Sequence, residues 1–270
     1  MVPMRGRLLV LLVLPAAGLV ACGDDADPLE LVTAAGAETV DDGNARLQST
    51  TEVTAGGTTV TIEAEGLVDF EGDRAALTTE LPGGQGQLEV VADGTTLYLR
   101  GPNLAALGVT TPWASVDLER VDDLTGTDLE DLQSSGDEAS SGLGLLSGAK
   151  EVEEVGEEEL DGTETTHYRA TVDLRRAVEE AGAVSDRAAF EAFVEQLGDE
   201  EIDVDVWLDG EDRVRRLRYE QPVPDQEGAT ATVTLDLTDL GVDEQVEVPP
   251  SAEATDITDR VLEEAEAATA

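Results

Sequence analysis

The sequence has few of the residues on which covalent cross-linking and most side-chain chemistry depend. It contains one cysteine and one histidine, and aromatic residues make up 3% of its 270 positions. A single cysteine excludes a disulfide within the chain. With so few rings, a core must be built from Val, Leu, Ile and Ala, which bury less apolar surface per residue than aromatic side chains do.

Basic residues are scarce as well. The chain has 16 Lys and Arg residues against 61 Asp and Glu residues, which gives a formal net charge of −45. Such a chain repels phosphate backbones, so we expect no nucleic-acid partner. A hydrophobic content of 40% nevertheless excludes a chain that is disordered throughout.

The first apolar run ends in the only cysteine. Arg5 and Arg7 precede an apolar segment over 8–20, an order typical of a secretory signal and too short for a membrane-spanning helix. The run Leu-Val-Ala-Cys at 19–22 resembles the bacterial lipobox, whose cysteine is lipidated and becomes the first residue of the mature protein. We therefore predict a lipoprotein signal peptide over 1–21, lipidation of Cys22, and a short tether over 22–27. The expected location is the extracytoplasmic face of the cell membrane, held by the lipid anchor; the alternative is a plain secretory signal with an incidental cysteine.

Period-two alternation of apolar and polar residues dominates the rest of the chain and predicts strands. The clearest examples are 59–70 and 229–240, and the turns Gly56-Gly57, Asp93-Gly94, Asp161-Gly162 and Asp209-Gly210 separate neighbouring strands. Helices are predicted over 28–40, 174–181 and 185–197. The Gly- and Ser-rich stretch over 124–148 is either a solvated connection with one helical turn or a mobile lid over an apolar cavity, with its apolar residues at Leu143, Leu145 and Leu146.

These elements predict an α+β domain over 28–250, a large curved antiparallel sheet of about ten strands wrapped around an N-terminal helix and a mid-chain helix pair. Pro249-Pro250 is expected to end the sheet. Residues 251–270 then form an acidic C-terminal tail, in which Ile257, Val261 and Leu262 give a short helical stripe.

Three segments resemble a known family. They are Glu-Leu-Asp-Gly-Thr-Glu at 159–164, Val-Asp-Val-Trp-Leu-Asp at 204–209 with the Arg-rich strand that follows, and Ala-Thr-Val-Thr-Leu at 231–235. Together with the lipobox, their order is similar to that of the LppX/LprA/LprF/LprG lipoproteins of mycobacteria. The resemblance implies a LolA-like half-barrel with a hydrophobic cavity that carries an acylated lipid or lipoglycan, and a membrane transporter is an open candidate partner.

Residues on the predicted inner face would line such a cavity or simply form the core, and the sequence does not separate these two roles. The predicted lining residues are Val60, Ile62, Leu88, Val90, Leu143, Leu146, Phe190, Phe193, Val204, Val206 and Leu208.

The polar residues do not form a recognisable catalytic pattern. His167 lies on the opposite strand face from Tyr168 and Ala170, so we expect it to face solvent. Nothing around it suggests a nucleophile, a metal site or a phosphate-binding loop. We therefore expect no catalytic residue, no metal, no cofactor and no enzymatic activity.

Four arginines, at 213, 215, 216 and 218, follow a strand that carries Asp203, Asp205 and Asp209. They either pair with these carboxylates across a hairpin or form a patch for anionic headgroups or an acidic partner.

The leading hypothesis for function is a lipid-anchored envelope protein that binds an acylated lipid and transports or presents it. The alternative from another class is an envelope interaction or sensor module that uses the outer surface of the same fold and carries no lipid. A hydrolase that depends on His167 is a third hypothesis.

Overall fold

The structure is a computed structural model and describes residues 27–81, 84–102, 104–125, 135–180, 187–198, 200–223, 226 and 228–269. The predicted signal peptide, Cys22 and nearly all of the tether lie outside the described residues.

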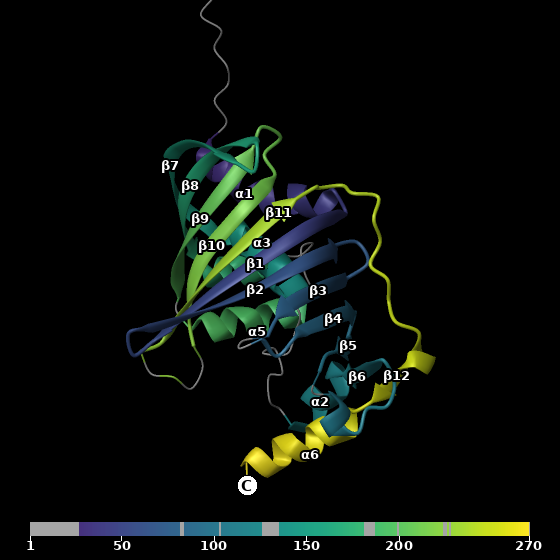
Figure 1. The fold of residues 1–270 in the computed structure, drawn as a ribbon. Helices are drawn as coiled ribbons and strands as arrows, with labels where there is room; N and C mark the ends of the chain where they lie inside the picture. The colour runs from purple at the N-terminus through teal and green to yellow at the C-terminus, as the bar shows by residue number, and fades with distance from the viewer. Residues whose placement is uncertain are drawn as a thin grey trace, which may run out of the picture.

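Twelve strands form a single open sheet in the described part of the chain (Figure 1). Their order across the sheet is β12-β6-β5-β4-β3-β2-β1-β11-β10-β9-β8-β7, and every neighbouring pair is antiparallel except β12 and β6. The strands are β1 (Asn44–Ala55), β2 (Thr58–Asp69), β3 (Arg74–Glu80), β4 (Gln87–Asp93), β5 (Thr96–Arg100), β6 (Trp113–Asp117), β7 (Ala149–Leu160), β8 (Thr163–Asp173), β9 (Glu201–Asp209), β10 (Val214–Pro222), β11 (Thr230–Thr238) and β12 (Ala254–Asp256).

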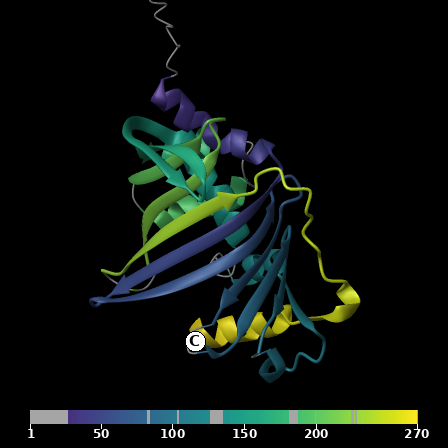
Figure 2. The same cartoon turned by 45° about the horizontal axis from the view of Figure 1, so that its top comes forward.

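The sheet curls around helices, as Figures 1 and 2 show from two directions. The predicted helix pair is present as α4 (Leu174–Glu180) and α5 (Arg187–Leu197), and the N-terminal helix as α1 (Pro28–Asp41). Asp27 caps α1 through a hydrogen bond from the Leu29 backbone N–H, and Pro28 occupies the first turn, where its missing N–H is not needed. The predicted α+β half-barrel is therefore confirmed.

Residues 135–148 form more helix than the single turn predicted for this connection. They comprise α3 (Ser135–Leu145) and the short turn η4 (Leu146–Gly148), and Leu143, Leu145 and Leu146 are at most 1% exposed. Small residues allow this helix to approach its neighbours: a Cβ added to Gly36 of α1 would lie 2.3 Å from the Leu143 carbonyl oxygen. Leu143, Leu145 and Leu146 are thus part of the core, while 126–134 of the same predicted segment lie outside the described residues and the mobile lid stays a prediction.

The segment predicted as an acidic tail contributes to the sheet. After Pro250, β12 pairs with β6 and α6 (Thr258–Thr269) packs against β6 and α2 (Leu118–Thr125). Ile257 and Leu262 are buried there together with Val116 and Val121. Pro249-Pro250 thus does not end the sheet; it precedes a parallel edge strand.

Candidate functional site

Seven of the predicted lining residues are buried in the main core. This core lies between the sheet and helices α1, α3, α4 and α5, and each of the seven is at most 9% exposed. Two of them, Phe190 and Phe193 of α5, have ring centroids 6.3 Å apart, and Phe193 meets Tyr219 of β10 edge-on at 6.1 Å. The seven residues are Leu143, Leu146, Phe190, Phe193, Val204, Val206 and Leu208.

The other four, Val60, Ile62, Leu88 and Val90, lie on the same face of the sheet but are not fully covered. Val60 is 49% exposed and Ile62 45% exposed, while Leu88 and Val90 are half-buried. We call the set Val53, Val60, Ile62, Ala64, Leu88 and Val90 the apolar band.

Strand register makes the band continuous. Val60 pairs with Val53 of β1, and Ala64 pairs with Thr79, which in turn pairs with Leu88 on β4. Because side chains alternate along a strand, residues paired in register share a face. The band therefore crosses four strands on the concave side, with Thr79 as its polar link.

Among the residues that the structure describes, the helices cover the band only in part and leave Val60 and Ile62 about half exposed. The helix α3 contacts β3 and β10, and α5 contacts β10, whereas α6 contacts β6. The hairpin of β1 and β2 also extends past the end of β3, since β3 pairs only with the segment of β2 from Ala64 onward.

The chemistry of this face is uniform. The inward positions of β1 to β4 carry Val, Ile, Leu, Ala, Gly, Ser and Thr, whereas Glu52, Glu63, Glu65 and Glu89 occupy outward positions. A face without charge favours an apolar ligand, because desolvating a charge there would oppose binding. Among the inward positions of β1 to β4, the Ser and Thr hydroxyl groups have no acidic or basic side chain beside them.

His167 lies on the outer face, as the alternation predicts, but it is packed rather than solvated. Its ring stacks on Trp207 at 4.1 Å, and its Nε2 lies 2.8 Å from Asp205 Oδ1. The Trp207 indole N–H donates to the Glu158 carboxylate, and the Arg216 guanidinium covers the indole ring at 5.8 Å. This cluster binds neighbouring strands of the sheet together.

The four arginines have two kinds of partner. Arg213 and Arg215 bind Asp209, and Arg218 lies opposite Asp205, as pairing across the hairpin predicts. Arg216 instead binds Asp236 of β11 at 2.5 Å. Sequence reasoning missed this pair because it considered only the hairpin of β9 and β10, whereas β10 also pairs with the next strand, β11.

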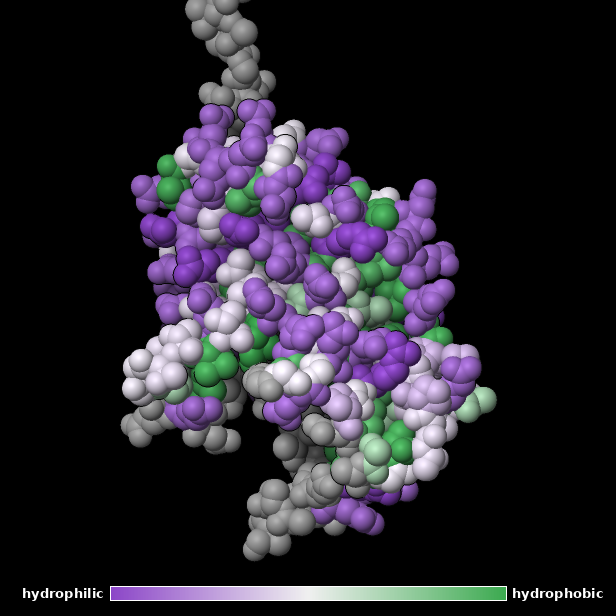
Figure 3. Space-filling view, in the orientation of Figure 1, coloured by the Kyte–Doolittle hydropathy of each residue, from purple (hydrophilic) through white to green (hydrophobic). Residues whose placement is uncertain are grey.

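The position of residues 241–250 was not predicted from the sequence. Residues 241–250, which we call the strap, cross the convex face, where Val246 packs on Leu67, Val91 and Trp113. A cavity of ≈ 950 Å³ lies between the strap and the sheet. Figure 3 shows an apolar area on this convex side.

The described residues were also compared with the requirements of a membrane-spanning helix and of a metal site. None of their helices combines the length and the apolar character needed to cross a membrane. Within the same residues, no three His, Cys, Asp or Glu side chains are grouped as metal ligands would be.

No protein-family model matches the sequence, and no curated protein matches it significantly. Solved structures do match. LprF from Mycobacterium bovis aligns with a TM-score of 0.50 at 13% identity, over 83% of this chain and 96% of its own. The lipoprotein LppX from Mycobacterium tuberculosis aligns at 14% identity with a TM-score of 0.47, over 82% of this chain and 100% of its own. A LolA superfamily protein from Nitrosomonas europaea aligns at 8% identity with a TM-score of 0.32, over 84% and 97%. The predicted resemblance is thus confirmed for the fold, and we conclude that this chain has the fold of LprF.

Proposed function

We propose that this protein binds the acyl chains of a lipid or lipoglycan against the apolar band, and transports or presents that lipid at the extracytoplasmic face of a membrane. The observation that supports the proposal most directly is the exposure of Val60 and Ile62 on a concave face without charged side chains. Scattered exposed apolar residues are ordinary, but a continuous band beside a covered core is typical of a ligand site.

Partition between two apolar environments would drive binding, with no change in covalent bonds. An acyl chain that leaves water gains about 0.8 kcal/mol per buried methylene. When the chain comes from a bilayer instead, it is already buried, so that gain largely cancels. The remaining favourable free energy comes from the apolar surface of the band that the acyl chain covers. We therefore expect reversible exchange of lipid and not high-affinity binding.

Lipidation of Cys22 would keep the band near its source of lipid. One acyl chain gives only marginal membrane binding, whereas two or more give stable anchoring. The anchor is testable in a bacterial host by metabolic labelling with an alkyne fatty acid. We expect label on the wild-type chain and none on Cys22→Ala; equal labelling of both would exclude Cys22 as the lipidated residue.

Native mass spectrometry of the Cys22→Ala protein, purified from a lipid-producing host without detergent, tests the cargo. We expect the protein to retain a non-covalent lipid that is released on unfolding. Protein that is free of lipid, and that also fails to bind a pyrene-labelled diacylglycerol, would contradict the proposal and favour the interaction module.

A further inference from the structure

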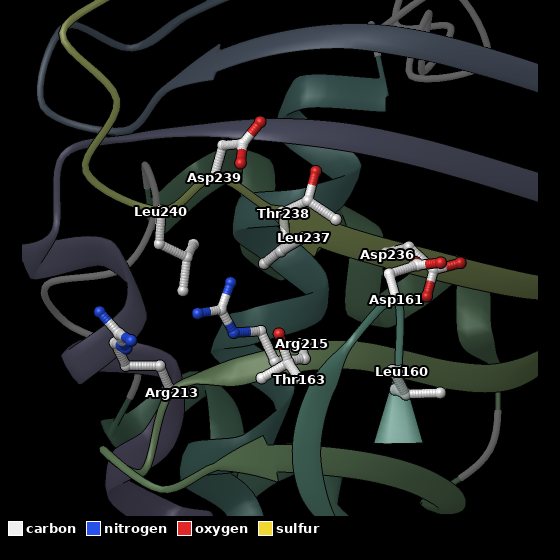
Figure 4. Close-up of a pocket in the computed structure, with 10 residues that line it drawn as sticks. All are labelled: Leu160, Asp161, Thr163, Arg213, Arg215, Asp236, Leu237, Thr238, Asp239 and Leu240. Carbon is white, nitrogen blue, oxygen red and sulfur yellow. The ribbon is translucent and has the colours of Figure 1, made fainter.

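A cavity of ≈ 430 Å³ lies at one end of the sheet, where the turn between β7 and β8 meets the end of β11 (Figure 4). Its lining is mixed. Leu160, Leu237 and Leu240 supply apolar walls, Thr163 supplies a hydroxyl group, and Arg213 and Arg215 supply guanidinium groups.

The two arginines share one buried carboxylate. The Asp209 side chain is 4% exposed, and it binds Arg213 at 2.9 Å and Arg215 at 2.8 Å. Burial opposes its ionisation. The hydrogen bonds that it accepts from Arg213, from the backbone N–H groups of Glu211 and Arg213, and from Arg215 outweigh burial and lower the pKa of Asp209. The carboxylate is therefore charged and fixes both guanidinium groups.

The donors of the two arginines are not equally used. Arg213 also reaches Asp42 at 3.2 Å and Glu211 at 2.6 Å, so all its guanidinium nitrogens have acceptors. Arg215 donates through Nε only. No hydrogen bond joins its Nη1 or Nη2 to any residue that the structure describes, and Figure 4 shows this end of the side chain directed into the cavity, below Leu240.

We propose that this cavity binds an oxyanion of low charge, a carboxylate or a phosphate monoester, that carries a short apolar group. The two terminal nitrogens of Arg215 match the two oxygens of such a group in the bidentate geometry that arginine favours. The apolar group contacts Leu160 and Leu240, and the Thr163 hydroxyl group supplies a further donor.

The carboxylates around the opening set the charge of the ligand. Asp236 is already paired with Arg216, and Figure 4 shows Asp161 and Asp239 directed away from Arg215. These carboxylates therefore do not bind the terminal nitrogens of Arg215. However, together with a net charge of −45 they repel anions of higher charge, so a carboxylate or a phosphate monoester is favoured over a di- or triphosphate.

The cavity is separate from the apolar band. Leu237 pairs with Leu47 on β1, and Val53 of the band lies six residues further along that strand. At about 3.3 Å per residue, the two sites are roughly 20 Å apart along the strand. The inference therefore stands or falls independently of acyl-chain binding.

Calorimetric titration of the full mature chain with monobutyl phosphate, and separately with butyrate, tests the site. Arg215→Lys keeps the positive charge but removes the two terminal guanidinium nitrogens. We expect the affinity of this variant for at least one probe to fall about tenfold, the equivalent of one charge-assisted hydrogen bond. Arg218→Lys is the matched control, because Arg218 is exposed on the same strand opposite Asp205. Its affinity should not change, and thermal melting should show both variants folded.

Flotation with phosphatidylcholine vesicles, with and without phosphatidic acid, identifies the source of the oxyanion. Association with phosphatidic acid that depends on Arg215 would assign a lipid headgroup, and probe binding without flotation would assign a soluble small molecule. Either outcome supports the proposal. Absence of saturable binding to both probes and to both vesicles, or equal losses in Arg215→Lys and Arg218→Lys, would overturn it.

Discussion

Val60 and Val155 provide a matched pair for testing the apolar band. Both are valines on strands, 49% and 51% exposed, but Val60 belongs to the band whereas Val155 lies on the edge strand β7. If a valine presents roughly 150 Å² when fully exposed, covering half of it at about 25 cal/mol per Å² contributes about 2 kcal/mol. Val60→Ser should therefore weaken acyl-chain binding by about tenfold to thirtyfold.

Fluorescence titration with a pyrene-labelled diacylglycerol measures this difference. Val155→Ser should bind as the wild type does, because no ligand is expected to cover it. Each substitution should lower the free energy of unfolding by less than about 1 kcal/mol, since both side chains are half-exposed on strands. Unchanged binding by Val60→Ser, or the same loss in both variants, would refute the assignment of the band.

Three further predictions concern stability. Leu143→Ala should lower the free energy of unfolding in urea by about 3 kcal/mol, because the side chain is 1% exposed in the core; a loss below about 1 kcal/mol would contradict its burial. Gly36→Ala should lower the melting temperature measured by circular dichroism, since the new Cβ would lie 2.3 Å from the Leu143 carbonyl oxygen; an unchanged melting temperature would show that α1 and α3 separate without loss. Asp209 has a lowered pKa in the fold, so its contribution to stability is present above the unfolded pKa of about 3.9 and is lost as pH falls through the folded pKa. Asp209→Asn should therefore lower the free energy of unfolding at pH 7 by more than it does at about pH 3, and a difference independent of pH would contradict the pairing with Arg213 and Arg215.

Strands and amphipathic helices were predictable because their side-chain period reports which face is buried. Alternation at 229–240 places Ala231, Val233, Leu235 and Leu237 inward, and all four are at most 4% exposed. Phe190 and Phe193 likewise mark the buried side of α5. In both segments one face is covered over its whole length, so local pattern and tertiary environment agree.

The helix α3 was not predictable from its composition. Glycine and serine have low helix propensity, and the same residues are typical of loops. In the fold they are needed for close packing: a Cβ on Gly142 would lie 3.0 Å from a Leu217 methyl group, and one on Gly144 would lie 3.0 Å from the Phe190 ring. The edge strand β12 was not predicted for a different reason. Three residues are too few to show the alternation of a strand, and their partner β6 is distant in sequence.

The candidate sites were predictable only in part. Alternation places Val60 and Ile62 on the inner face. Their exposure, however, depends on how far the helices extend over the sheet, which the local sequence of β2 does not predict. The Arg-rich strand was visible in the sequence, yet a register shift between Val214 and Arg216 places Arg215 at an irregularity of the ladder. The sequence therefore could not predict which of the arginines lines a cavity.

Photo-crosslinking with a diacylglycerol that carries a diazirine on its acyl chain tests the central claim most directly. Peptide mapping by mass spectrometry should locate the crosslinks in the apolar band, on the peptides that contain Val53, residues 60–64 and residues 88–90. Crosslinks confined to the strap or to the outer face of β7 to β10 would contradict the account.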